Sequence, residues 1–241
     1  MPPAIVVHHL EMSRSTRIIW ALEELGLAYE LKTWKRDPTT FRAGPEIKAI
    51  HPVGRFPVVS IDDLVLAESG AILEYLAEAF GALSPQAPAE RIQYRYWLHF
   101  AEGSLMPPLL VALITGRLRT RVPFPLSLVS GAIGKKVDQQ YTWPQLADLL
   151  TAVDGHLKDH PWFAGEHFSM ADIQMSYPGI AALERVPGAK ESYPALADWA
   201  RRAQARAAFQ KAVQVHNDIF CHGVIYIGLA NAAPSLFRFR I

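Results

Sequence analysis

The sequence predicts a small mixed α/β domain at the N-terminus, followed by an all-helical domain. Short strand-like segments and amphipathic helices alternate over about the first eighty residues. Beyond them the strand patterns fade and helical spacing dominates. The segment between them, residues 81–88, is rich in Gly, Pro and Ala, as linkers are. We therefore place the two domains at residues 1–82 and 90–241.

The first domain opens with a strand, a helix and a second strand. Residues 5–7 form a short apolar strand, and residues 29–34 alternate apolar and polar side chains as a half-buried strand does. Between them, residues 13–25 carry apolar side chains at helical spacing, and Gly26 is a typical helix stop. This order predicts a parallel strand pair joined by a right-handed crossover.

The rest of this domain predicts two more strands and a second helix. A short helical piece is expected near residues 46–50, and residues 57–61 read as a strand. Asp62-Asp63 is a plausible tight turn, after which residues 64–66 return antiparallel. A helix then begins at Ser69, with Ile72, Leu76 and Phe80 on one face. Together these elements predict a four-stranded mixed sheet with helices packed on it.

The second domain reads as a bundle of about five or six helices. Helical spacing of apolar residues occurs in 91–105, 146–157, 171–183 and 196–212, and residues 122–125 interrupt it. Ser169 and Asp172 have the spacing of a capping box, which we interpret as purely structural. The tail, residues 221–241, is compatible with covering a cleft, packing at a subunit interface or being poorly ordered, and the sequence does not decide among these.

Composition narrows the classes of function. The 241 residues carry a formal charge of +1, which argues against a nucleic-acid partner and against binding to anionic membranes. The longest apolar run, residues 105–115, contains Pro107 and Pro108, so no membrane span is predicted. One cysteine, Cys221, excludes an intrachain disulfide and a zinc site of several thiolates. Without a recognisable signal peptide, these features predict a cytoplasmic protein.

A metal site is not predicted from the nine histidines. His156 and His160 have the i, i+4 spacing of a ligand pair, but no convincing third ligand lies nearby. Both fall at the predicted C-terminal end of a helix, where histidine interacts favourably with the helix dipole. We therefore favour the dipole interpretation.

Two hydroxyl-bearing segments each have a structural and a functional interpretation. Ser13 and Ser15 precede the first helix, where a serine either caps the helix or directs its hydroxyl at an anion. Glu68 and Ser69 precede the second helix, where Ser69 is either a plain cap or part of a clamp. Such a clamp holds the α-ammonium and the α-carboxylate of an amino acid through charge-assisted hydrogen bonds.

The segment Arg55-Phe56-Pro57 also has two interpretations. Pro57 lacks an N–H group, so it opens the strand or lies at its edge. An ordinary trans turn is the more common case, since cis bonds are about 5–6% of X–Pro bonds. A cis bond would leave the backbone of Phe56 free to pair with an extended peptide.

Taken together, these segments resemble the glutathione transferases, and most closely the serine-type bacterial and fungal members. The resemblance extends over most of the chain, through the capping box at residues 169–172. It implies a thioredoxin-like first domain and a helical second domain. The ordered motifs are Ser13-Arg14-Ser15-x-Arg17-x-x-Trp20-x-Leu22-Glu23-Glu24-Leu25-Gly26, Gly54-Arg55-Phe56-Pro57-Val58 and Glu68-Ser69-x-Ala71-Ile72.

The resemblance also implies roles for individual residues. Ser13 matches the hydroxyl that hydrogen-bonds the glutathione sulfur, with Ser15 as the alternative. Pro57 matches the family's cis-proline, and Phe56 the residue whose backbone pairs with the cysteinyl part of glutathione. Arg55 and His51 match residues that contact the glycine end of glutathione. Glu68 and Ser69 match the clamp that holds its γ-glutamyl end.

The implied activity is glutathione conjugation to small hydrophobic electrophiles, a detoxification reaction, by a cytoplasmic homodimer with glutathione as cosubstrate and no metal. Two alternatives remain open: a non-catalytic glutathione-binding or scaffold module, and a glutathione-dependent peroxidase or isomerase. We expect the electrophile to occupy an apolar cleft near Leu10 and Met12, and near a helix that carries Trp97, Leu98 and Met106.

Overall fold

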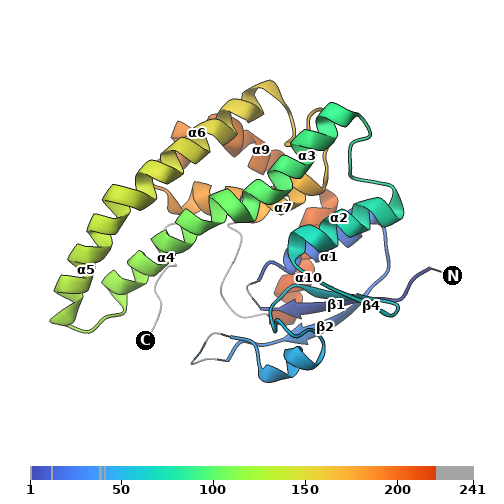
Figure 1. Cartoon of the computed structure of the whole chain (residues 1–241), viewed down its shortest axis with the longest axis horizontal. Coiled ribbons are helices and arrows are strands. Elements are labelled where there is room, and N and C mark those ends of the chain that lie inside the picture. Colours follow the sequence, from blue (N-terminus) through green and yellow to red (C-terminus); the bar gives the residue numbers. More distant parts are fainter. Residues whose placement is uncertain (1, 12, 38–39, 41, 221–241) are drawn as a thin grey trace.

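The computed structural model describes residues 2–11, 13–37, 40 and 42–220, and it confirms the predicted mixed sheet (Figure 1). The strand order is β2-β1-β3-β4. The pair β1 and β2 is parallel, and the other two pairs are antiparallel. The strands are β1 (Ile5–Leu10), β2 (Glu30–Trp34), β3 (Val58–Ile61) and β4 (Leu64–Ala67).

Two helices, α1 (Thr16–Leu25) and α2 (Ser69–Phe80), lie together on one face of this sheet (Figure 1). The predicted stop at Gly26 is confirmed, because this glycine has a φ of 64° that suits a left-handed helix cap. The predicted short helical piece is a 3-10 helix, Pro45–Ala49. The first helix begins at Thr16 and not at Ser13. The hydroxyls of Ser13 and Ser15, which precede it, hydrogen-bond to each other and not to the helix.

Two long helical rods dominate the second domain (Figure 1). Helix α3 (Pro88–Phe100) continues through a π-helical turn, Ala101–Leu105, into α4 (Met106–Thr120). Helix α5 (Leu126–Val137) continues through a second such turn, Asp138–Thr142, into α6 (Trp143–Asp159). A proline follows each turn, at Pro107 and Pro144. A proline lacks the N–H for an ordinary helical bond and its ring collides with the carbonyl four residues earlier, so a wider turn is favoured there.

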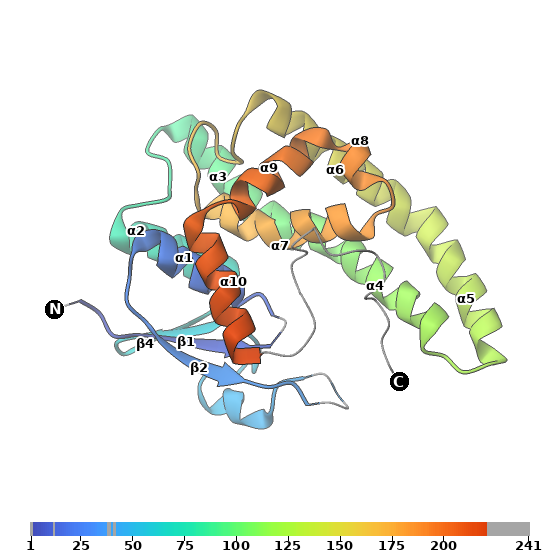
Figure 2. The same ribbon diagram turned by 180° about the vertical axis from the view of Figure 1, so that it is seen from behind.

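Four shorter helices complete the described chain: α7 (Met170–Arg185), α8 (Ala189–Ser192), α9 (Pro194–Gln204) and α10 (Ala207–Phe220). Counted as continuous rods, the described residues beyond the linker form six helical segments, as predicted. The predicted stripe over residues 196–212 is divided between α9 and α10. The break lets α10 turn back along α1, with Arg206 bound through two nitrogens to Glu24 at 2.6 and 2.7 Å (Figure 2).

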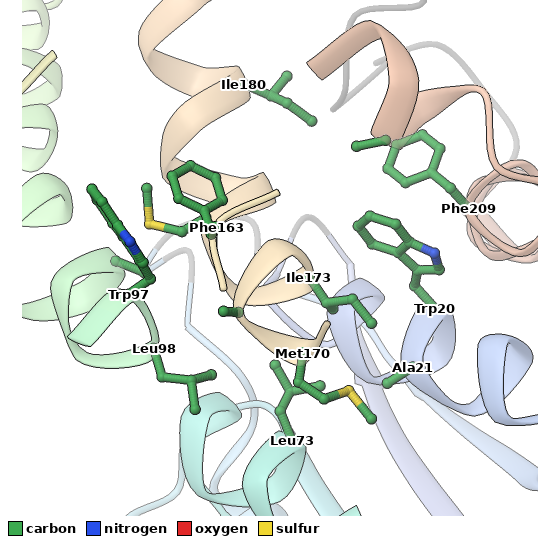
Figure 3. Packing of buried hydrophobic residues seen from close by; sticks show 14 of the residues in the cluster. Trp20, Ala21, Leu73, Trp97, Leu98, Phe163, Met170, Ile173, Ile180 and Phe209 are labelled. Atoms are coloured by element: carbon green, nitrogen blue, oxygen red, sulfur yellow. The ribbon is translucent and has the colours of Figure 1, made fainter. Parts of the chain in front are cut away.

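One hydrophobic core extends through both domains, with α7 at its centre. Figure 3 shows Met170 and Ile173 of α7 lying beside Ala21 of α1 and Leu73 of α2. Twelve of the sixteen residues of α7 are buried, so this helix packs against its neighbours around most of its circumference and not on one stripe. The helical domain therefore buries apolar side chains of α1 and α2 in the first domain.

By length and composition alone, the rod Pro88–Thr120 is apolar enough to cross a membrane. The sequence predicted no membrane span here, because the apolar run contains Pro107 and Pro108. A core helix of a soluble protein passes the same test, and this rod contributes Trp97, Leu98 and Leu105 to the core. The rod is thus weak support for a membrane span.

The predicted capping box is confirmed at the start of α7. The Ser169 hydroxyl accepts from the Ala171 N–H at 3.2 Å, and the Asp172 carboxylate accepts from the Ser169 N–H at 2.9 Å. Asp172 also accepts from the Phe163 N–H at 3.0 Å, the Trp199 indole N–H at 2.9 Å and the Ser169 hydroxyl at 3.1 Å. Burial raises the pKa of Asp172 to about 6, although these four donors oppose the rise.

Replacing Asp172 therefore tests how much the buried cap contributes. Asp172→Ala leaves three buried N–H donors without an acceptor, and we expect it to lower the free energy of unfolding by about 3 kcal/mol or more. Asp198→Ala is the matched control, because Asp198 is exposed and its partner Arg201 is largely solvated, although Arg202 is partly buried. An exposed pair contributes about 1 kcal/mol or less. Denaturant unfolding of both variants measures the difference, and equal losses would contradict the assigned role.

Candidate active site

The sheet register brings three of the predicted site segments to one end of the sheet. His8 near the end of β1 pairs with Val58, and Val58 pairs with Ala67 at the end of β4. The loop after β1, the Phe56–Pro57 segment before β3 and the Glu68–Ser69 segment after β4 therefore meet at the same edge. This edge faces the start of α1, where helix N–H groups attract negative charge.

The two serines before α1 do not cap it. Ser15 occupies the N-cap position but makes no side-chain capping bond, so the structural interpretation of this residue is wrong. Its Oγ lies 2.6 Å from the Ser13 Oγ and 2.6 Å from the Nδ1 of His9. Ser15 is fully buried, whereas Ser13 lines a cavity. Ser13 is thus the hydroxyl that a ligand can reach.

Arg17, on the first turn of α1, is a site residue for which the sequence predicts only a share, with Arg14, in the positive field around the glutathione sulfur. Its buried guanidinium donates from Nη1 to Glu102 at 2.6 Å and to the Ser69 hydroxyl at 3.1 Å. Its Nε and Nη2 are buried without a hydrogen-bond partner in the described residues. Arg14 also donates to Glu102, at 2.9 Å. Burial works to raise the pKa of Glu102, but Arg17 and Arg14 hold it below its usual value.

Glu68 and Ser69 are likewise not an ordinary capped helix start. Glu68, not Ser69, holds the N-cap position, and no side-chain capping bond is formed there. Glu68 is exposed with a φ of 70°, which is uncommon for a residue with a Cβ atom and tends to occur at functional sites. Ser69 is buried, and its hydroxyl accepts from Arg17. The capping interpretation of Ser69 is therefore wrong.

The remaining predicted site residues surround the start of β3. The Phe56–Pro57 bond is cis, and Pro57 is buried. The Phe56 ring lies 5.8 Å from the ring of Trp34, measured between centroids. Arg55 is exposed, and the buried Nδ1 of His51 has no hydrogen-bond partner in the described residues. None of these residues lines the cavity beside Ser13.

That cavity lies between α1, α7 and α10. Figure 3 shows Trp20 of α1, Ile180 of α7 and Phe209 of α10 directed toward one region. The edge of the Trp20 ring meets the Phe209 ring at 4.9 Å between centroids. Polar side chains also line the cavity, among them Ser13, Arg17, Glu184, Arg185 and His216.

The expected lining from the helix with Trp97 and Leu98 is wrong for this cavity. Both residues are buried in the core, where the Trp97 ring packs 4.8 Å from the ring of Phe163. Leu10 is also buried in the core, and Met12 lies outside the described residues. The aromatic stripe of this helix is a packing face. No sequence signal separates such a stripe from a cleft wall.

The histidine pair at the end of α6 is part of the packing too. The ring of His156 lies 4.7 Å from that of Trp97, and its Nε2 lies 3.0 Å from the Phe163 carbonyl oxygen. Among the described residues, no group of three or more His, Cys, Asp or Glu side chains is arranged to hold a metal ion.

Comparison with known proteins identifies the family. Residues 2–78 match the model of the glutathione S-transferase N-terminal domain, and residues 119–207 match that of the C-terminal domain. Glutathione S-transferase 1 of Saccharomyces cerevisiae is 35% identical over 218 residues, covering 86% of this chain and 93% of the relative. Glutathione S-transferase 3 of Schizosaccharomyces pombe is 34% identical over 217 residues, covering 89% and 88%.

Solved structures agree with the sequence relatives. A glutathione S-transferase from Actinobacillus pleuropneumoniae is 29% identical with a TM-score of 0.71, over 88% of this chain and 93% of that one. A theta class glutathione S-transferase from Xanthomonas axonopodis pv. citri, with glutathione bound, is 28% identical with a TM-score of 0.68, over 88% and 97%. The predicted resemblance is confirmed: this chain belongs to the glutathione S-transferase family, whose cosubstrate is glutathione.

Proposed function

We propose that the Ser13 hydroxyl hydrogen-bonds the sulfur of glutathione in this transferase. We also propose that the second substrate is a small hydrophobic electrophile. The observation that supports this proposal is the position of the Ser13 hydroxyl. It lines a largely apolar cavity at the N-terminal end of α1, with buried cationic Arg17 beside it. Glutathione, when bound, supplies the thiol that becomes the nucleophile.

The task of the chain is to favour the thiolate over the thiol. A free thiol with a pKa near 8.5 is only a few per cent thiolate at neutral pH. Lowering that pKa by about two units requires roughly 2.7 kcal/mol of preference for the anion. A hydrogen bond from Ser13 and the positive end of the α1 dipole together account for a preference of this size. Arg17 adds less, because Glu102 offsets its charge.

The γ-glutamyl end of glutathione fits the residues beyond Ser13. An α-carboxylate suits the buried Nε and Nη2 of Arg17, which have no hydrogen-bond partner in the described residues, and the Ser69 hydroxyl beside them. The exposed Glu68 carboxylate suits the α-ammonium. At the other end, we assign the Phe56 backbone to the cysteinyl part, next to Pro57, and we assign Arg55 and His51 to the glycine carboxylate.

We further propose that the chain divides this work between its two domains, residues 1–82 and 90–241. The first binds glutathione, and the second supplies α7 and α10 to the electrophile cavity. The apolar side chains of Trp20, Ile180 and Phe209 in that cavity support a hydrophobic second substrate. We propose the cytoplasm as the compartment, in keeping with a single cysteine in the chain.

Ser13→Ala tests the proposed catalytic hydroxyl. We expect the pKa of bound glutathione to rise by about one to two units and kcat/KM to fall about 10- to 100-fold, since a hydrogen bond to a charged group is lost. Ultraviolet difference absorbance of the thiolate, followed against pH, measures the first quantity. Ser192→Ala, at an exposed serine of α8, is the control.

Two outcomes would contradict this assignment. Full activity in Ser13→Ala together with lost activity in Ser15→Ala would transfer the donor role to Ser15. A wild-type protein whose bound glutathione keeps the pKa of the free thiol would leave a binding module and not a transferase.

Glu68→Gln tests the γ-glutamyl clamp separately from the chemistry. The amide keeps the shape of the side chain but loses the charge that attracts an ammonium group, so we expect KM for glutathione to rise about tenfold with kcat nearly unchanged. Glu191→Gln, at an exposed position of α8, serves as the control. A fall in kcat at constant KM would place Glu68 outside the clamp.

The proposed homodimer has a direct test. The edge strand β4 exposes Leu64 and Val65, and α3 exposes Ile92 and Tyr96, which supports contact with a second copy. Light scattering coupled to size exclusion should give a mass of about twice the 26.8 kDa of the chain. A monomer mass at micromolar concentration would refute the dimer.

A further inference from the structure

A row of four buried side chains connects the last described helix to Ser13. His216 of α10 places its Nδ1 2.9 Å from the Nε2 of His9 on β1. The Nδ1 of His9 lies 2.6 Å from the Ser15 Oγ, which lies 2.6 Å from the Ser13 Oγ. All four side chains are at most 8% exposed. Ser13 and His216, the two ends of the row, line the same cavity, and the two residues between them do not.

Both rings in this row stay neutral. Burial and the neighbouring His216 lower the pKa of His9 to about 3. Burial also lowers the pKa of His216, although Glu11 opposes this change. A neutral imidazole carries one N–H, so each histidine donates from one nitrogen and accepts at the other.

The Ser15 hydroxyl also lies 3.5 Å from the Leu10 carbonyl oxygen, which is much longer than its 2.6 Å contacts to His9 and Ser13. Along these short contacts the row runs in one of two directions. In the inward direction, Ser13 donates to Ser15, Ser15 donates to the Nδ1 of His9, and His9 donates to His216. In the outward direction, His216 donates from Nδ1 to His9, His9 donates from its Nδ1 to Ser15, and Ser15 donates to Ser13. Only in the outward direction is the proton of the Ser13 hydroxyl free to point into the cavity.

A thiolate accepts hydrogen bonds and cannot donate one, so the outward direction is the one that stabilises it. The Ser15 backbone N–H also donates to the Ser13 Oγ, at 3.2 Å. With a second donor from the Ser15 hydroxyl, both acceptor positions of Ser13 are filled by protein, and its own proton is available to the ligand.

We propose that His216 and His9 are positioning residues that set this direction. The N–H at Nδ1 of His216 fixes the tautomer of His9, and His9 in turn directs the hydroxyl protons of Ser15 and Ser13 toward the glutathione sulfur. This inference rests on the proposed role of Ser13. It makes the C-terminal helix, 207 residues away in sequence from His9, part of the thiol-binding machinery.

The experiment compares two substitutions at one position. His216→Leu removes the donor, and we expect the pKa of bound reduced glutathione to rise by about one unit, as partial loss of a charge-assisted bond implies. His216→Asn keeps an amide N–H near the place of Nδ1 and should hold the pKa close to the wild-type value. His99→Leu, at an exposed histidine of α3, is the control for a histidine lost elsewhere.

A second readout needs no turnover. Nitrogen-15 NMR of the imidazoles distinguishes the two tautomers, and we expect the wild-type protein with glutathione bound to carry the His9 proton on Nδ1. A proton on Nε2 of His9 in that complex would overturn the proposal, even if the position-216 variants fail to fold. So would an unchanged thiol pKa in a folded His216→Leu variant.

These outcomes separate the positioning role from the proposed function. If Ser13→Ala raises the thiol pKa and His216→Leu does not, the role of Ser13 stands and the positioning role of His216 and His9 is refuted. If Ser13→Ala leaves the thiol pKa unchanged, the role of Ser13 fails first, and the positioning role fails with it.

Discussion

A buried guanidinium holds the candidate site together, and the elements around it depend on its partners. Arg17 reaches Glu102 and Ser69, so one side chain joins α1, α2 and the long α3–α4 rod. A buried charge with its partner removed costs several kcal/mol. The rod must therefore present a carboxylate at this position. Glu102 lies on the π-helical turn that precedes Pro107, where the rod widens.

The regular elements of the first domain could be predicted because their signals are local. Alternation in residues 29–34 and the stop at Gly26 require only neighbouring residues to be recognised, and both are confirmed. The start of α1 was placed three residues too early. A serine before a helix usually caps it, but here the two hydroxyls bond to each other, and that of Ser15 also bonds to the Nδ1 of His9.

The site was predictable in part. The motif order indicated Ser13, the cis Phe56–Pro57 bond and the Glu68–Ser69 pair, and it gave Arg17 only a share in a diffuse positive field. His9 and His216 carried no signal at all, since neither belongs to a recognisable motif and their pairing spans most of the chain. Contacts of this kind are set by how α10 packs on α1, which the sequence spacing does not reveal.

The single core has a consequence for how the molecule loses its structure. Because α7 lies against both α1 and α2, the hydrophobic interiors of the two domains form one continuous core. A fragment that ended in the linker would leave the apolar faces of α1 and α2 in water. The two domains differ in architecture, yet we expect them to unfold as one cooperative unit. Proteolysis at the linker should release two aggregation-prone fragments and not two stably folded domains.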